Sequence, residues 1–193
     1  MPPMVLESLV TTIRPDGTVN VAPMGPLVDR QLTQFTLRPF KTSQTYQNLK
    51  QGSPVVVHVT DDVRLLAAAA IGAATEELIG PLTRCPQTGG VILQNTCRWY
   101  ALQVVQLDDA QDRATIECMV AAQGRLRDFF GLNRALHAVV EGAILATRVD
   151  FLPLDGIEQD LERLRPLIEK TGGDPEREAF AQICDFVATK RGS

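Results

Sequence analysis

The stretch RPFKTSQTYQNLKQGSPVVVHVT, residues 38–60, carries the clearest secondary-structure signals in the chain. A short helical pattern covers residues 43–50, and the glycine and proline that follow are typical of a helix end. Residues 54–60 are dominated by valine, and β-branched side chains favour a strand that packs on a core. The stretch therefore predicts a short helix that leads into a central strand.

Strand patterns also dominate the chain before this stretch. Residues 4–13 and 18–22 are rich in valine, threonine and other strand formers, and they flank the turn Pro15-Asp16-Gly17. Proline presets φ and glycine accepts a positive φ, so these two strands are predicted to form a hairpin. Residues 30–37 alternate between polar and apolar side chains, which indicates a third strand.

The chain after the central strand begins with an aspartate pair at 61 and 62, either of which can cap a helix over residues 63–71. Residues 72–96 are rich in glycine, proline and threonine and predict a long loop. Residues 98–107 and 114–120 predict a second hairpin around an acidic turn.

From about residue 125 onward, apolar residues recur at helical spacing. Three such stripes lie within residues 132–144, 161–168 and 179–187. Asp174 is expected to cap the third helix, and Pro166 is expected to kink the second.

Strand patterns followed by helical patterns predict a β-rich α+β fold, in which a β-barrel or sheet carries an appended helical segment. We expect the barrel over residues 1–122 and a C-terminal helical subdomain over residues 123–193. The same order disfavours a doubly wound parallel sheet.

The composition is that of an ordinary globular protein, with 193 residues, 45% hydrophobic and 22% charged, and a net charge of -4. The acidic balance argues against nucleic-acid binding, which needs a basic face. The four cysteines and two histidines lack the spacing of a zinc site, so no metal is expected. Because no signal peptide or membrane-length apolar run is evident, the sequence predicts a cytoplasmic protein without a membrane partner.

Two polar features are candidates for a binding site. Around residue 41, a lysine is followed by hydroxyl side chains where a strand ends and a helix begins, which suits a phosphate group. The alternative is a simple helix cap with a solvated lysine. The second feature, VAPMGP at residues 21–26, breaks a strand and would let a flat ring approach the backbone, unless it is an ordinary bulge.

These features occur within a longer pattern. ESLVTT at residues 7–12, NVAPMG at 20–25, RPFKTSQTYQNL at 38–49 and VHVTDD at 57–62 resemble the DUF447 family. The C-terminal segments NRA at residues 133–135, AVVE at 138–141 and ATR at 146–148 also resemble that family's helical domain. One departure is His58, where the family usually carries asparagine. The family belongs to the FMN-binding split β-barrel group, together with flavin reductases and pyridoxamine-phosphate oxidase-like proteins.

The resemblance implies an FMN-binding split β-barrel with a C-terminal helical subdomain, and a homodimer with FMN near the subunit interface. It implies phosphate-side residues at Lys41, Thr42, Ser43 and Thr45, with Asn48 behind them. It also implies that the isoalloxazine ring lies against the backbone of Ala22, Pro23, Met24 and Gly25. Arg38 would face the pyrimidine edge of the flavin, unless it is a solvated arginine at a strand end.

Three functional hypotheses follow from these observations. The chain is an FMN-dependent oxidoreductase of unknown substrate, a non-enzymatic flavin-binding or carrier module, or an interaction protein whose barrel site is empty. In the first case the cofactor performs the hydride or electron transfer, so no catalytic side chain is assigned. The small-molecule redox partner is unknown, and without a GxGxxG motif any nicotinamide nucleotide would bind only transiently.

Overall fold

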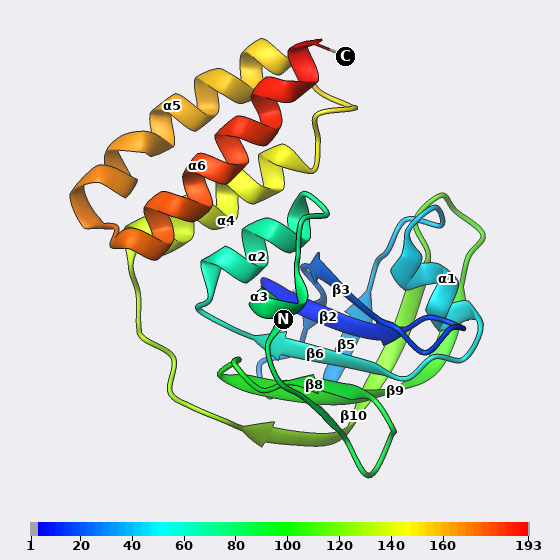
Figure 1. The fold of residues 1–193 in the computed structure, drawn as a ribbon. Helices are drawn as coiled ribbons and strands as arrows, with labels where there is room; N and C mark the ends of the chain where they lie inside the picture. The colour runs from blue at the N-terminus through cyan, green and yellow to red at the C-terminus, as the bar shows by residue number, and fades with distance from the viewer. Residues whose placement is uncertain (1–3, 193) are drawn as a thin grey trace. The chain divides into compact units, whose positions relative to one another are not determined.

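The computed structural model describes residues 4–192 of the chain. It divides into two compact units (Figure 1). The barrel unit combines the chain up to residue 60 with residues 80–128, and the helical unit combines residues 61–79 with the chain from residue 129 onward. The helical unit therefore includes a segment that the expected boundary at residues 122 and 123 assigned to the barrel.

The barrel unit is built on an eight-stranded sheet with strand order β1-β4-β5-β10-β9-β6-β2-β3, in which every neighbouring pair is antiparallel. In that order the strands are Met4–Val5, Leu27–Val28, Gln34–Leu37, Thr115–Arg125, Arg98–Asp108, Val55–Val59, Ser8–Ile13 and Val19–Met24. Both hairpins expected from the sequence are present, as β2–β3 and β9–β10.

The sheet curls because its two edges belong to one bent hairpin. Strands β2 and β3 pair up to Ser8 opposite Met24, and the ladder continues through the bond from Leu6 N–H to the Pro26 carbonyl, at 3.0 Å. Beyond that bond, β1 pairs with β4. One half of the hairpin pairs with β6 and the other half with β5, at opposite ends of the sheet order. The hairpin thereby brings the sheet back on itself, as Figure 1 shows.

Strand β6 is buried on both faces. Val55 and Val57 lie in the inner core with Phe35 and Tyr100, whose ring centroids are 5.3 Å apart. The other face carries Val56, which packs with residues of the small hairpin β7–β8, formed by Leu82–Arg84 and Val91–Leu93. This burial explains the run of valines in the sequence.

The prediction of a long loop over residues 72–96 was wrong. This segment contains α3, Glu76–Ile79, as well as the β7–β8 hairpin. Strands of three residues give almost no periodic signal, and this hairpin depends on tertiary contacts. Thr11, for example, donates its hydroxyl to the Val91 carbonyl at 2.6 Å.

The third expected strand is shorter than its pattern. Only Gln34–Leu37 pairs in the sheet, as β5. The carboxylate of Asp29 accepts hydrogen bonds from the amides of Thr33 and Gln34, at 2.8 and 2.9 Å. These bonds fold the preceding residues into a turn, which competes with strand formation.

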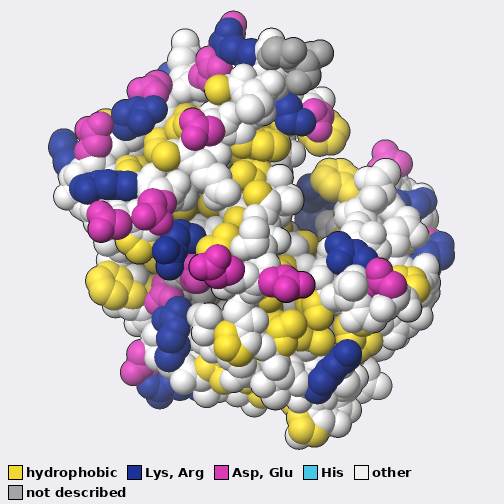
Figure 2. Space-filling view, viewed as in Figure 1, with side chains coloured by type: hydrophobic (Ala, Val, Ile, Leu, Met, Phe, Trp, Pro, Cys, Tyr) yellow, Lys and Arg dark blue, Asp and Glu magenta, His cyan; other side chains and the backbone are white. Residues whose placement is uncertain are grey.

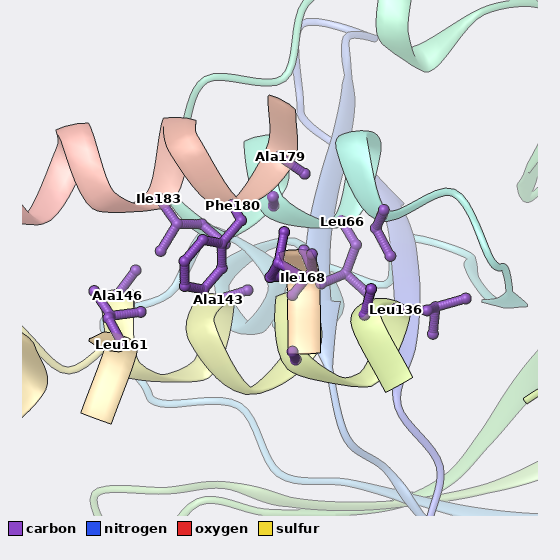
Figure 3. Packing of buried hydrophobic residues seen from close by; sticks show 14 of the residues in the cluster. Leu66, Leu136, Ala143, Ala146, Leu161, Ile168, Ala179, Phe180 and Ile183 are labelled. Atoms are coloured by element: carbon purple, nitrogen blue, oxygen red, sulfur yellow. The ribbon is translucent and has the colours of Figure 1, made fainter. Parts of the chain in front are cut away.

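The helical unit packs α2, Val63–Ala70, with α4, Arg134–Ala146, α5, Leu154–Thr171, and α6, Asp174–Thr189. A 3-10 turn, Lys190–Gly192, follows α6. Figure 3 shows side chains from these helices interdigitating, among them Leu66 of α2 and Phe180 of α6. Because α2 contributes an apolar face to this core, it belongs with helices that lie far away in the sequence.

The cap of α6 differs from the sequence expectation, whereas the kink expected at Pro166 stays a prediction. Gly173, rather than Asp174, occupies the N-cap of α6, and the Glu176 carboxylate accepts its amide at 2.8 Å. Asp174 instead lies in the first turn, where a negative charge favours the helix dipole. Pro166 lies inside α5, which continues through it to Thr171.

Candidate functional site

The expected phosphate-side residues lie at the start of α1, Gln44–Lys50. Ser43 caps this helix: its hydroxyl accepts from Tyr46 N–H at 3.2 Å and donates to the Phe40 carbonyl at 2.7 Å. Thr42 is exposed. The first amides of a helix have no partner within it, so this turn offers hydroxyl and amide donors.

Lys41 is held by the turn between β9 and β10. Its amide donates to the Asp112 carbonyl at 3.1 Å, and its ammonium donates to the Asp109 carbonyl at 3.0 Å. The Lys41 side chain is half-buried. An ammonium that makes one such bond retains further N–H donors, so Lys41 can also bind an anion.

Thr45 and Asn48 face the interior of the barrel unit, with 2% and 1% exposure. Asn20 of β3 donates to the Thr45 hydroxyl at 3.2 Å, and Asn48 donates to the Thr12 hydroxyl of β2 at 2.9 Å. Asn20 also donates to Thr12 at 3.3 Å and accepts from Arg14 at 3.3 Å. The network ties α1 to both strands, so Thr45 and Asn48 fix the position of the helix.

The expected ring wall lies on the same edge strand as Asn20. Ala22, Pro23 and Met24 end β3, where a proline is tolerated because this strand has a neighbour on one side only. A Cβ atom on Gly25 would lie 2.7 Å from Cγ1 of Val5. The close approach that this glycine permits is thus filled on its Cβ side by Val5 of the same chain.

Arg38 follows β5 directly and is exposed. The next residue, Pro39, is tied to the sheet, because its carbonyl accepts a hydrogen bond from the amide of Ala114 at 3.0 Å. Of the expected site residues, those on α1 and those on β3 are linked through the bond from Asn20 to Thr45. Arg38 makes no hydrogen bond or ion pair with either group within the described residues.

A second cluster beside α1 is not evident from the sequence patterns. The Tyr46 hydroxyl donates to Oδ2 of Asp109 at 2.6 Å, and the Lys50 ammonium donates to the same oxygen at 2.7 Å. Lys50 also lies 3.0 Å from the Tyr46 hydroxyl. Hydrogen bonds from Lys50 and then Tyr46, with a smaller effect of the Lys41 charge, lower the pKa of Asp109 to about 2. The only sequence signal for this cluster was the acidic turn itself.

His58 and Cys97 are buried packing residues. Nδ1 of His58 lies 3.3 Å from the Leu9 carbonyl, and Nε2 accepts from Leu93 N–H at 3.1 Å. Burial lowers the pKa of His58 to about 4, so the ring is neutral and donates through Nδ1. Cys97 is 1% exposed. Both side chains therefore stabilise the barrel unit.

Charged side chains and potential metal ligands give no sign of a second site on the parts of the surface that can be assessed among residues 4–192. Acidic and basic side chains are interspersed over the face shown in Figure 2. In the described part of the chain, no group of three or more histidine, cysteine, aspartate or glutamate side chains is arranged to hold a metal. Nor does any described helix have the length and apolar character needed to cross a membrane.

A curled antiparallel sheet of this topology, accompanied by a helical unit, defines a split β-barrel protein. Residues 6–127 match the family described as "Protein of unknown function (DUF447) N-terminal domain", and residues 133–185 match "Protein of unknown function (DUF447)". The chain therefore belongs to the DUF447 family, as its sequence motifs indicated.

Solved structures agree with this fold class. An FMN-bound DUF447 protein from Methanosarcina mazei matches with a TM-score of 0.81 at 19% identity, over 95% of each chain. The 2-nitrobenzoate 2-nitroreductase NbaA from Pseudomonas fluorescens matches at a TM-score of 0.52 and 16% identity, over 64% of each chain. Flavoredoxin from Methanosarcina acetivorans matches at 0.52 and 12% identity, over 64% of this chain and 69% of that one. At these identities the likeness establishes the fold, and the expected split β-barrel is confirmed.

Proposed function

We propose that this protein binds FMN in its barrel unit and acts as a flavin-dependent oxidoreductase. The observation that carries the proposal is the match, over 95% of both chains, to a protein of the same family whose structure is FMN-bound. Flavins bring hydride and electron transfer chemistry, whereas the protein supplies binding, orientation and electrostatics. The proposal therefore needs no acid or base from this chain.

The residues near Lys41 fit a phosphate group. Lys41 supplies a positive charge with N–H donors beyond the one used by Asp109, and the exposed Thr42 supplies a hydroxyl donor. Ser43 caps α1, and its hydroxyl proton is already donated to the Phe40 carbonyl, so its role is to hold the turn beside the phosphate. Thr45 and Asn48 are too deeply buried for broad contact with a ligand, so we assign them to holding α1 in place. Charge-assisted bonds of this kind are among the stronger contacts to a phosphate.

The flat ring of the cofactor would lie along residues 22–25. In this proposal the backbone of Ala22, Pro23, Met24 and Gly25 forms one wall, and Arg38 faces the pyrimidine edge. The half-buried end of β3 and the exposure of Arg38 are compatible with these roles. The chain's contribution to redox chemistry would be to orient the ring and to limit its contact with water.

We also propose that the protein is a cytoplasmic homodimer with the flavin near the subunit interface. The β9–β10 hairpin exposes apolar side chains, with Val105 at 64% and Met119 at 47% exposure, which suit contact with a second copy. Sedimentation or light scattering of the purified protein tests this state, and a monomer at all working concentrations would contradict it.

The flavin proposal is tested by the visible absorbance of the purified protein and by identification of any chromophore released on heating. Released FMN supports the proposal, and a colourless protein that also fails to take up added FMN contradicts it. Reduction by NAD(P)H with turnover of an acceptor would then distinguish an enzyme from a flavin carrier, which retains FMN without turnover.

A double variant tests the placement of the phosphate. Lys41→Ala removes one charge-assisted contact, worth about 1.5–3 kcal/mol, and Thr45→Ala in the same chain loosens α1 by removing the hydroxyl that accepts from Asn20. We expect a weaker FMN affinity in a fluorescence titration. Lys170→Ala, at an exposed position in α5, is the control for the loss of one lysine charge and should bind FMN like the parent chain. Unchanged affinity in the double variant would place the phosphate elsewhere.

A further inference from the structure

The acidic turn at residues 108–112 presents a problem for any anion bound at Lys41. The backbone carbonyl of Asp109 accepts the Lys41 ammonium at 3.0 Å, and the Lys41 charge is the smallest of the causes that lower the pKa of the Asp109 carboxyl. A carboxylate in this position would repel a phosphate and weaken the attraction of Lys41.

Two side chains of α1 compensate for this carboxylate. The Lys50 ammonium lies 2.7 Å from Oδ2 of Asp109, and the Tyr46 hydroxyl lies 2.6 Å from it. Lys50 is the only one of the two that carries a positive charge. Its own pKa is raised, mainly by the hydrogen bond to Asp109, so it remains protonated.

Other charged groups of the turn are engaged differently. The Asp108 carboxylate accepts the amide of Ala110 at 3.0 Å, and the Arg113 guanidinium lies 4.0 Å from the centroid of the Phe40 ring. Neither group makes a hydrogen bond or ion pair with the ammonium of Lys41 among the described residues. Lys50 is thus the cation that pairs with Asp109 through its side chain.

We propose that Lys50 is a positioning residue for the phosphate end of the flavin: it neutralises Asp109, so that the charge of Lys41 stays directed at the ligand. This inference rests on the proposed FMN-binding function. The two lysines then have different roles, because Lys41 would touch the phosphate whereas Lys50 would act through Asp109.

The test compares the affinities for FMN and riboflavin, which differ by the phosphate group. The parent chain should prefer FMN, and Lys50→Met should lower the ratio of the two affinities about threefold to tenfold, because an uncompensated carboxylate then faces the phosphate. Lys50→Arg should keep the ratio. Lys170→Met makes the same charge change in α5 and should also keep it.

A second substitution distinguishes electrostatics from simple support of the turn. Adding Asp109→Asn to Lys50→Met removes the unpaired carboxylate and should restore the ratio, although it cannot restore the ion pair. Circular dichroism checks that each variant is folded. The inference is overturned if Lys50→Met leaves the ratio of the two affinities unchanged, even when both flavins bind more weakly. It is also overturned if the double variant does not recover the parent ratio.

The outcomes for the parent chain separate this inference from the proposed function. A parent that binds neither flavin overturns the proposed function. A parent that binds both flavins equally retains a flavin site but overturns the roles given to Lys41 and Lys50.

Discussion

The barrel unit and the helical unit are held together by different kinds of core. Every buried polar side chain among the described residues belongs to the barrel unit: Ser8, Thr11, Thr12, Asn20, Thr45, Asn48, His58 and Thr96. In the described part of the helical unit, the buried side chains are apolar and come from α2, α4, α5 and α6.

The two kinds of core differ in how strictly they fix the position of the elements that they join. An apolar core tolerates many packings of similar volume, whereas a buried hydrogen-bond network is satisfied by one arrangement of its donors and acceptors. The network of Asn20, Thr12, Thr45 and Asn48 specifies where α1 lies on β2 and β3. Among its described residues the helical unit has no buried polar side chain of this kind, so its core depends on hydrophobic burial.

The largest expected effect is the loss of an aromatic side chain from the helical core. Phe180 is 2% exposed, and Phe180→Ala should destabilise the helical unit by about 3–5 kcal/mol through lost burial and a residual cavity. Far-UV circular dichroism during urea unfolding reports mainly on helices. Fluorescence reports on Trp99, the one tryptophan of the chain, which lies in β9 of the barrel unit.

The two signals decide whether the units are separate. We expect the circular dichroism transition of Phe180→Ala to shift more than the fluorescence transition. Phe130→Ala removes the same side chain from a position that is 80% exposed and should change stability by less than about 0.5 kcal/mol. Equal shifts in both signals would show that the two units unfold as one.

A smaller effect is expected from acid, and it should originate in the barrel unit. The pKa of His58 falls from about 6.5 in the unfolded chain to about 4 in the folded one. The unfolded state therefore binds a proton more readily, and stability should fall as pH decreases from about 6.5 to about 4. The shift corresponds to at most about 3 kcal/mol.

The comparison with His58→Asn isolates this contribution, because asparagine can donate and accept without titrating. Urea unfolding at pH 7 and pH 4, followed by the fluorescence of the cross-strand neighbour Trp99, should show a smaller loss for the variant. The same loss in both proteins would assign the acid sensitivity to other groups.

The smallest expected effect contrasts two glycines. A Cβ atom at Gly156 of α5 would meet no atom within 4 Å, so Gly156→Ala should stabilise the helical unit by about 0.4–1 kcal/mol. A Cβ atom at Gly124 of β10 would lie 2.6 Å from the Trp99 ring, so Gly124→Ala should destabilise the barrel unit. Thermal unfolding of both variants measures these signs, and a stabilising Gly124→Ala would show that Trp99 moves freely.

Much of the barrel and part of the site could be predicted from local signals. The β2–β3 hairpin follows from its proline-aspartate-glycine turn, and the short helix expected over residues 43–50 is present as α1. The family motifs assigned the phosphate side to Lys41 and its neighbours, and this assignment stays a prediction. The Asp109 cluster could not be predicted, because Tyr46 and Asp109 are 63 positions apart and neither residue type has a pattern that links them.

The sequence by itself determined the secondary structure with strong periodicity, the order of strands before helices, and the membership of the DUF447 family. These features depend on neighbouring residues or on short sequence motifs. Only the tertiary structure decided that α2 joins the helical unit, that Val5 fills the space beside Gly25, and that Lys41 and Lys50 share Asp109. These contacts depend on how distant segments are brought together, which the closing of the sheet and the packing of helices determine.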